Sequence, residues 1–585
     1  KAAGRTTPDQ TGTKPDQTEF KSDQIKSEGG RKAGTLLQRI AMLDGAERND
    51  HVAAFFHLSS IGDAGATRAV LQRAALRWAG VDVPGGIEDL LRRTCEARAE
   101  GAAQGRPRVV FGCALQGNSP DGKWGPSSLG GGIGGSEQAV IHMAHQLQLQ
   151  GYQVEVYGRP APHDTGADKH GVLWLPWFLM LRLSSPGACG EPRSEVGISR
   201  NGSNARAAAY IAWREYVSPI VMRAYAERTY IWLHDQVQVA DASDDRVLAA
   251  TDKFLVLSNF HASQLPPKAR SKAFVTRNAV DAALFSDELV DTTEDTTGDT
   301  TAKAARVEDT TTEGARSEDE VVRLEEDGTG EAVRVEDKTV AGEARSNEAH
   351  RFVYASMPAR GLHAVLQAWP TIRHCIHRGL NRSAQLHVFY GFTPFDRLTA
   401  AQDPAFRKWM EGTEEVLRQM ADQGVIHRGM VGHKELWRSF RRAGFALYPS
   451  AFPETSCITL MKAQAAGAVP VTSRFTHSAV PETVLFDLGP HPPLAPSDPL
   501  LGLANVSKAY IQSWAMQVCA VAGGLGPAES AAAVQLISGQ AGDDVGAFRG
   551  RMISWARETL RWDAVAREWA THLLPPASAA FAHYS

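Results

Sequence analysis

Short apolar runs recur along two stretches of the chain, with helical patterns between them. In the first stretch the runs predict strands at residues 108–113, 152–157, 229–233, 253–257 and 273–276. In the second stretch they predict strands at residues 351–355, 384–390, 424–427, 445–448 and 469–472. Strands that alternate with helices are typical of parallel sheets covered by helices on both faces. The pattern therefore predicts an α/β protein with two domains.

Two segments before the first domain lack this alternation. Residues 1–30 are polar and almost without large apolar side chains, so we expect them to be disordered. Residues 31–104 show helical periodicity, as in 35–43 and 87–93, and predict an extension of two to four helices. The first α/β domain is then expected at 105–285.

An acidic stretch separates the two α/β blocks. Residues 286–350 contain no Phe, Trp or Tyr, and Asp, Glu, Thr, Ala and Gly dominate them. Such a segment buries too little apolar surface to offset the entropy lost on ordering. We expect a disordered acidic insertion, either a solvated spacer or an acidic docking segment, before a second domain at 351–547.

The last helical pattern predicts one packed helix at 548–575. Trp555, Trp562 and Trp569 recur there at every seventh position, which places them on one helical face. Aromatic side chains gathered on one face are typical of a helix that packs against a core.

Composition narrows the classes of function. The chain has 585 residues with a net charge of −4, and 43% of its residues are hydrophobic and 22% charged. These values are ordinary for a globular protein, and the lack of a basic excess argues against a nucleic-acid partner. The six cysteines are scattered without a C-x-x-C pair, which argues against structural zinc and a dense disulfide framework. We therefore expect the protein to reside in the cytoplasm or another reducing compartment. The first residue is Lys1, so whether the N-terminus is complete stays an open question.

One apolar run is relevant to the question of membrane association. Residues 172–181 are apolar, but a spanning helix needs roughly 20 such residues, and Pro176 interrupts the run. We expect no transmembrane span. The run is interpreted as a buried strand or short helix, with a patch that touches a membrane surface or a lipid acceptor as the alternative.

A glycine-rich loop, Leu129–Glu137, opens the first long helix of the first domain. Glycines let a backbone approach a ligand, and the helix N-terminus behind them favours a phosphate. Gly130, Gly132 and Gly135 also fit G-x-G-x-x-G, and Glu155 falls where a ribose-binding acid would lie, so an NAD(P)-dependent oxidoreductase is one alternative. In that fold the glycines follow the first strand directly, whereas 114–129 intervene here. A cleft wall that contacts substrate, or a structural glycine turn, fits this spacing better.

Two polar residues follow predicted strands. His234 and Arg360 come just after the strands 229–233 and 351–355. Ligands of open α/β sheets bind at the carboxyl ends of the strands. His234 would touch a reacting sugar or be structural, and Arg360 would grip a diphosphate or form a surface ion pair.

A strand-to-helix turn, Phe452–Gly467, carries the most chemistry. The carboxylate of Glu454 is expected where the helix begins, beside the amides of Thr455, Ser456 and Cys457. A free helix N-terminus binds anions, and a carboxylate beside it can hold hydroxyls, so the turn suits a ligand with phosphate and sugar. Capping of the helix by Glu454, Thr455 or Ser456 is the alternative.

Together, the order of these motifs resembles that of the retaining glycosyltransferases of the group-1, family-4 type, which have the GT-B architecture. The resembling segments are Gly134–Glu137, Asn278–Asp281, Arg360–Gly361, Gly432–Leu436, Phe452–Cys457 and Ala463–Pro470. The first four match, in order, the family's G-G-x-E loop, its N-G-[VI]-D turn with Ala279 in place of glycine, its basic-Gly contact, and the segment before the penultimate strand. The last two together match its donor-binding E-x7-E region. The resemblance covers about 107–285 and 351–575.

This resemblance implies two Rossmann-like domains that face each other across a cleft, with an acceptor on the first and a nucleoside-diphosphate sugar on the second. The final helix would cross back to the first domain. The donor is a co-substrate, and neither metal nor cofactor is implied. By analogy, His234 and Glu454 would be catalytic, one near the anomeric centre and the other on donor hydroxyls. The implied donor-binding residues are Gly134, Gly135, Arg360, Thr455, Ser456, Cys457, Ile458 and Lys462.

The chain departs from the family at the second glutamate of E-x7-E, which is Lys462. Eight residues make just over two helical turns, so Lys462 is expected near the face of Glu454. A lysine only donates hydrogen bonds, so it would donate to ribose oxygens or pair with Glu454. Weaker nucleotide binding, by about 1–3 kcal/mol, is expected. A degenerate member that binds a sugar nucleotide or a partner without catalysis is therefore a further alternative.

Base, sugar and acceptor are left open, and the acceptor would be a glycan, a lipid or a protein. Base contacts are expected from Ile426–Gly429.

Overall fold

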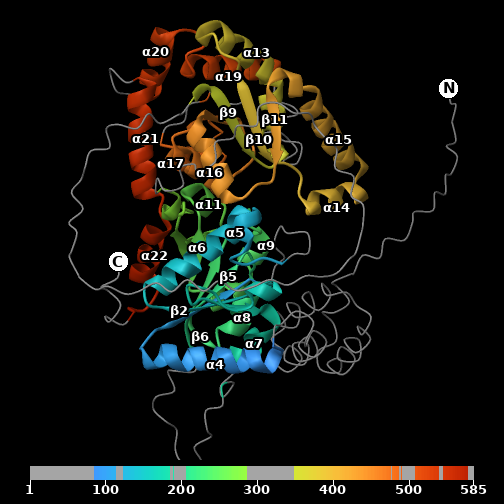
Figure 1. The fold of residues 1–585 in the computed structure, drawn as a ribbon. Helices are drawn as coiled ribbons and strands as arrows, with labels where there is room; N and C mark the ends of the chain where they lie inside the picture. The colour runs from blue at the N-terminus through green and yellow to red at the C-terminus, as the bar shows by residue number, and fades with distance from the viewer. Residues whose placement is uncertain are drawn as a thin grey trace, which may run out of the picture.

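The computed structural model describes residues 85–113, 123–184, 189, 206–285, 348–475, 477–485, 489, 507–538 and 544–577. Two β-sheets form the centres of two domains stacked one above the other (Figure 1). The predictions for 1–30, for the helices before residue 85 and for 286–347 lie outside the described residues. The last predicted insertion residues, 348–350, belong instead to a strand.

The N-terminal sheet has eight strands in the order β3-β4-β2-β1-β5-β6-β7-β8. All neighbours pair in parallel except β3 with β4. The strands are β1 Arg108–Gly112, β2 Gln153–Gly158, β3 Gly166–Ala167, β4 Leu173–Pro176, β5 Ala207–Trp213, β6 Ala226–Trp232, β7 Lys253–Val256 and β8 Ala273–Val275. Every strand predicted for this domain is present, whereas β3 and β5 were not predicted and β4 lies in the run 172–181, interpreted as a strand or short helix.

Helices cover both faces of this sheet, as the alternation predicts. On one face α6 (Gly135–Leu149) packs with the last helix, α22 (Trp562–His572), over Val109 and Phe111. On the other face α4 (Ile87–Ala103), α8 (Ser218–Met222) and α10 (Asp245–Ala250) pack over Val110 and Tyr210. Alternate residues of a strand point to opposite faces, so β1 supplies both cores.

The C-terminal sheet has five parallel strands in the order β11-β10-β9-β12-β13. They are β9 Glu348–Ser356, β10 Gln385–Tyr390, β11 Val425–Gly429, β12 Ala443–Tyr448 and β13 Val469–Thr472. Helices α13 (Leu362–Leu380) and α19 (Lys508–Val521) cover one face. Helices α16 (His433–Arg442), α17 (Ile458–Ala466) and α21 (Val545–Thr559) cover the other. The predicted fold class, two Rossmann-like domains that face a cleft, is confirmed.

The predicted single helix at 548–575 is wrong, because the chain forms two helices that break at Leu560. Helix α21 lies along the C-terminal domain and α22 along the N-terminal domain (Figure 1). The Leu560 carbonyl leaves the helix and accepts from the Val280 amide at 2.9 Å. Trp562 and Trp569 therefore belong to the N-terminal core, while Trp555 packs in the C-terminal domain. The chain does cross back between domains at this break.

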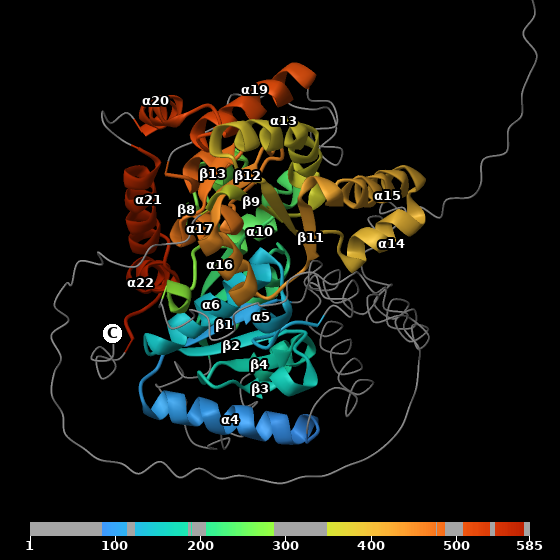
Figure 2. The same ribbon diagram turned by 45° about the horizontal axis from the view of Figure 1, so that its top comes forward.

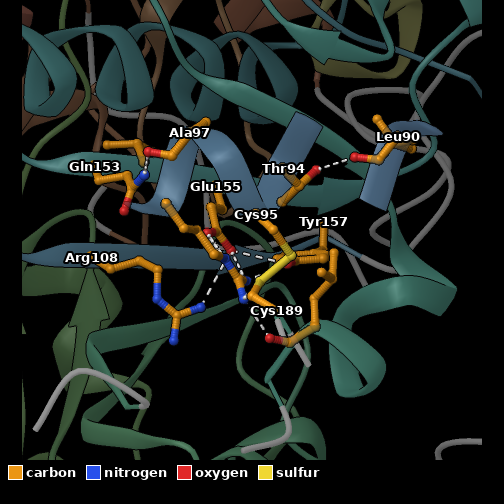
Figure 3. Close-up of polar contacts among 12 residues, drawn as sticks. Leu90, Thr94, Cys95, Ala97, Arg108, Gln153, Glu155, Tyr157 and Cys189 are labelled. Carbon is orange, nitrogen blue, oxygen red and sulfur yellow. Dashed lines mark hydrogen bonds and ion pairs between the residues drawn. A yellow bond between two sulfur atoms is a disulfide. The ribbon is translucent and has the colours of Figure 1, made fainter. Parts of the chain in front are cut away.

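Helix α4 is fixed to the N-terminal domain by a buried ion pair (Figure 3). The Glu155 carboxylate is fully buried on β2 and accepts from Arg98 Nε at 2.6 Å and from the Tyr157 hydroxyl at 2.9 Å. Burial raises the pKa of Glu155, but Arg98 and Arg108 outweigh it and lower the pKa to about 2. This pairing contradicts the alternative role of Glu155 as a ribose ligand.

Four of the six cysteines form two disulfides, although their scattered positions led to the expectation of a reducing compartment. Cys95 of α4 bonds to Cys189, and Cys375 of α13 bonds to Cys519 of α19, while Cys113 and Cys457 are free and buried. The partners are 94 and 144 positions apart, so their proximity arises only from the tertiary fold. Since disulfides persist mainly in oxidising compartments, the argument for a reducing one loses its basis.

The apolar run 172–181 forms β4, a 3₁₀ turn at Trp177–Leu179 and the start of α7 (Met180–Ser184). Its side chains are buried, so they leave no exposed apolar patch for a membrane or lipid. No helix within the described ranges is long and apolar enough to cross a bilayer.

Candidate active site between the two domains

A cavity of about 470 Å³ lies between the two domains, at the carboxyl ends of their strands. The N-terminal domain contributes the residues after β5 and β6 and the start of α6. The C-terminal domain contributes the ends of β9, β10 and β12 and the turn before α17. Lining residues include Gly134, Gly135, Ser136, Arg214, His234, Asp235, Asn278, Arg360, Tyr448, Glu454, Thr455, Ser456, Cys457 and Ile458. All predicted catalytic and donor-binding residues except Lys462 and the expected base contacts therefore border one cavity.

The N-termini of two helices from opposite domains open into this cavity. Helix α6 begins after Gly134 and α17 begins after Cys457, and neither has a side-chain cap. The two ends are in close contact, since a Cβ on Gly135 would lie 3.2 Å from Ile458 Cδ1. Uncapped helix N-termini carry unsatisfied N–H donors and partial positive charge. The cavity therefore has two converging anion-binding ends.

The earlier glycines of the loop serve a different contact. Gly132 has φ of +89°, and a Cβ there would lie 2.7 Å from the Val431 carbonyl oxygen of the opposite domain. A Cβ on Gly432 would lie 2.3 Å from the Gly130 carbonyl oxygen. These glycines let the two domain backbones touch, while Gly134 and Gly135 face the cavity.

Glu454 lies in the turn before α17, not at its first residue, which corrects the prediction. Its Oε1 is 2.6 Å from Arg360 Nη1 and accepts from the Tyr448 hydroxyl at 2.6 Å. The Arg360 guanidinium also stacks on the Phe452 ring, 3.3 Å from its centroid. Burial opposes the charge of Arg360, but the Glu454 carboxylate outweighs it and raises the pKa of Arg360. The two residues expected to hold different parts of a donor are thus paired with each other.

The capping alternative for this turn is also wrong. Thr455 Oγ1 donates to the His234 carbonyl at 2.7 Å, across the domain boundary. Ser456 Oγ is buried without a hydrogen-bond partner. The N-cap position belongs to Cys457, whose thiol pKa is raised to about 12 by burial. Among the described residues, no side chain of the turn makes a capping hydrogen bond to the start of α17.

His234 borders the cavity as a buried, neutral imidazole. It is 8% exposed, its ring centroid lies 4.5 Å from that of Trp232, and its Nε2 has no hydrogen-bond partner. Burial, with smaller effects from Arg214 and His261, holds its pKa well below the usual value. A buried imidazole with an unsatisfied nitrogen is suited to one hydrogen bond with a ligand hydroxyl.

Lys462 lies in the second turn of α17 and does not pair with Glu454, which contradicts that expectation. Because Glu454 precedes the helix, the two-turn relation between them does not hold. Lys462 Nζ is buried and donates to Gln138 Oε1 of α6 at 3.0 Å. Burial lowers its pKa to about 7, partly opposed by the charge of Asp281. Lys462 lines a second cavity of about 90 Å³, which shares Gly135 and other residues with the main one.

Sequence reasoning missed Arg214, which the structure places on the N-terminal wall. Arg214 follows β5 with φ of +61°, a conformation uncommon for arginine. Its Nε lies 2.6 Å and its Nη2 3.1 Å from the two carboxylate oxygens of Asp235. Its guanidinium also lies 4.9 Å over the Trp213 ring. Asp235 could have been identified from its position next to His234. No sequence signal identified Arg214, because β5 itself was not predicted.

Two other predicted features lie outside the cavity. Glu137 of the G-G-x-E loop is fully buried behind it, and burial raises its pKa. The segment Ile426–Gly429 is mostly the edge strand β11, and none of its residues lines either cavity. Within the described ranges, no three His, Cys, Asp or Glu side chains are grouped so as to hold a metal ion.

Comparisons with known proteins give only distant similarities. No family model and no curated protein matches the chain. Among solved structures, Anabaena HepE in complex with UDP and glucose gives a TM-score of 0.46 at 9% identity, covering 80% of this chain and 99% of its own. A glycosyltransferase from Rickettsia africae gives 0.44 at 10% identity, with 79% and 96% covered. Sucrose-phosphate synthase from Thermosynechococcus elongatus gives 0.40 at 13% identity, with 80% and 98% covered.

Proposed function

We propose that this protein transfers a sugar from a nucleoside-diphosphate sugar to a hydroxyl group of an acceptor, with retention of anomeric configuration. One observation carries most of the support. The uncapped N-termini of α6 and α17, from opposite domains, open into one cavity that also holds Arg360 and Glu454. Anion-binding groups beside a carboxylate match a molecule that has both a diphosphate and sugar hydroxyls.

When the donor binds, Arg360 and Glu454 would separate, and each would contact a part of the donor instead. Each of these side chains neutralises the other at 2.6 Å. A diphosphate offers Arg360 a second anion, and sugar hydroxyls offer Glu454 neutral donors in place of a guanidinium. Because Tyr448 also donates to Glu454, the carboxylate keeps one fixed hydrogen bond when Arg360 turns away. The two charged side chains thus neutralise each other and would each contact a different part of one bound substrate.

The reaction breaks the bond between the anomeric carbon and the diphosphate oxygen. The acceptor oxygen bonds to that carbon on the same face, and the acceptor proton passes to the leaving diphosphate or to water. The helix ends and Arg360 would stabilise the charge that develops on the leaving group, which is where electrostatic catalysis is most effective. Neutral His234 would hydrogen-bond a donor hydroxyl beside the anomeric centre, and Glu454 would orient the ring.

Lys462 is proposed to lie on the nucleoside side of the donor. Its small cavity adjoins the main one beside Ile458 and Thr459, at the start of α17. A ribose there would accept from Lys462 in place of Gln138. The acceptor would approach the N-terminal wall, where Arg214 holds the carboxylate of Asp235 toward the cavity. Its chemical class, glycan, lipid or protein, is left to experiment.

A donor-panel screen tests this proposal. Purified protein is incubated with UDP-, GDP- and ADP-sugars, and release of nucleoside diphosphate and free or transferred sugar is followed. We expect turnover of at least one donor, which E454Q abolishes and which E435Q, an exposed position on α16 of the same domain, leaves unchanged. Binding of a donor without turnover in wild type would favour the degenerate member. Tight binding of NAD or NADP instead would overturn the transferase proposal.

A further inference from the structure

Three arginines and one histidine, from four elements of the C-terminal domain, lie close enough for the arginine charges to act on the histidine. They are Arg351 of β9, His387 of β10, Arg428 of β11 and Arg442, the last residue of α16, and are called here the arginine cluster. Arg351 alternates with Val353 and Ala355, which face α16 in the core, so it shares their face. The cluster lies at the β11 edge of the five-stranded sheet.

This cluster is distinct from the candidate active site. None of its four members lines either cavity between the domains. Arg351 precedes Ser356, the cavity residue of the same strand, by five positions, which corresponds to roughly 16 Å along an extended strand.

The contacts within the cluster leave hydrogen-bond donors unused. Arg428 Nε donates to His387 Nδ1 at 3.5 Å, so His387 carries its proton on Nε2. His387 is 7% exposed, and its Nε2 has no hydrogen-bond partner among the described residues. Arg351 donates from Nη2 to Gln385 Oε1 at 3.4 Å, but its buried Nε has no partner within the same ranges. A buried N–H without an acceptor is costly, and a bound ion is one of the usual reasons why a native structure keeps such a group.

Among the described residues, Glu348 is the one carboxylate within 4 Å of a guanidinium of the cluster. Burial and repulsion from Arg351, Arg428 and Arg442 lower the pKa of His387 to about 4. The carboxylate that lies near Arg351 is Glu348, at 3.9 Å, and it lies closer to His350, at 3.2 Å. By contrast, the buried Arg98 and Arg360 each contact a carboxylate at 2.6 Å. Three guanidinium groups near one imidazole, with one carboxylate at 3.9 Å, suit an anion that none of the described residues supplies.

We propose that the arginine cluster is a second anion-binding site, for a phosphate group as the free ion or as a monoester. Arginine forks match the oxygens of a tetrahedral anion, and a neutral imidazole N–H adds one donor without further charge. The proposal does not depend on the proposed transferase activity.

Isothermal titration at constant ionic strength tests this site. Inorganic phosphate and glycerol 3-phosphate are titrated into the full chain with chloride as the exchanged counterion. We expect R428Q/R442Q, at two exposed positions, to weaken binding at least tenfold, while R378Q, exposed on α13 beyond the other sheet face, binds as wild type does. R360Q should retain this binding, because it alters only the interdomain cavity.

Either anion supports the proposal if its binding is lost in R428Q/R442Q, and the tighter of the two identifies the free ion or the ester. Equal affinity in wild type and R428Q/R442Q would overturn it, as would the absence of measurable binding by wild type. Circular dichroism of each variant checks that it is folded. The single variant R428Q gives a second measurement if R428Q/R442Q does not fold.

Discussion

Arg360 and Glu454, which both line the interdomain cavity, form an ion pair of 2.6 Å. Arg360 comes from the turn after β9 and Glu454 from the turn after β12, two neighbouring strands of the same sheet. Parallel strands bring such turns together at one edge, which is why residues 94 positions apart in the chain meet there. The pair is partly buried and also bonded to Tyr448, so its removal is expected to affect ligand binding more than folding.

Replacement of Arg360 should weaken the binding of nucleoside diphosphates. A lost charge-assisted hydrogen bond costs about 1.5–3 kcal/mol, which corresponds to roughly 10- to 150-fold in Kd. We expect R360Q to show this loss in titrations with UDP, GDP or ADP, and R378Q to show none. Equal affinities of R360Q and wild type would remove Arg360 from the diphosphate site.

Lys462 should make folding stability depend on pH. Its pKa falls from 10.5 in the unfolded chain to about 7 in the fold because of burial. Between these values the unfolded state binds more protons, so the free energy of unfolding should rise with pH, by up to about 1.4 kcal/mol per unit.

The measurement is denaturant unfolding of wild type and K462M at pH 7, 8 and 9. The free energy of unfolding of K462M should lack this part of the increase with pH. K462M should therefore exceed wild type in stability by the largest amount at pH 7. A constant difference between the two proteins across this range would show that Lys462 is not buried as described.

Lys462→Glu should also strengthen nucleotide binding, since a carboxylate can accept from both ribose hydroxyls. The comparison is the Kd of the best nucleoside diphosphate for wild type, K462E and K462M. If K462E binds more weakly than wild type, then Lys462 contributes more to nucleotide binding than a carboxylate at this position would.

Peptide mapping under non-reducing conditions should find Cys95 linked to Cys189 and Cys375 linked to Cys519. Alkylation after denaturation should label Cys113 and Cys457 alone. Loss of one disulfide, as in C375S/C519S, is expected to lower the free energy of unfolding by about 2–4 kcal/mol. Four or more alkylated cysteines in protein made in an oxidising compartment would contradict this pairing.

Glu155 should stabilise the protein above its unfolded-state pKa. Its pKa is lowered from 4.5 to about 2, so this stabilisation is complete above about pH 5 and lost as the pH falls toward 2. Breaking the buried pair by R98M should destabilise by about 3–5 kcal/mol, because the carboxylate is left without its main partner. Thermal unfolding of R98M and R92M, an exposed neighbour on α4, gives the comparison.

Most strands could be predicted from the sequence because each is a short apolar run bounded by polar turns. β5 could not, since four of its seven residues are alanines and give no strand signal. The sevenfold tryptophans predicted packing but not the break at Leu560, which depends on a hydrogen bond to Val280 from another domain. The sequence motifs identified residues on the N-terminal wall of the cavity and the turn before α17 on the opposite wall. The partners of Glu454, Lys462 and the cysteines are set by tertiary contacts that sequence spacing does not encode.

The stereochemistry of the product tests the central proposal most directly. With an α-linked donor from the panel, proton NMR of the earliest product should show the α-anomer, and E454Q should form none. A β-anomer as first product would contradict retention. A donor that binds in the cavity, shown by its loss of affinity in R360Q, yet is neither hydrolysed nor transferred with any acceptor, would contradict the transferase itself.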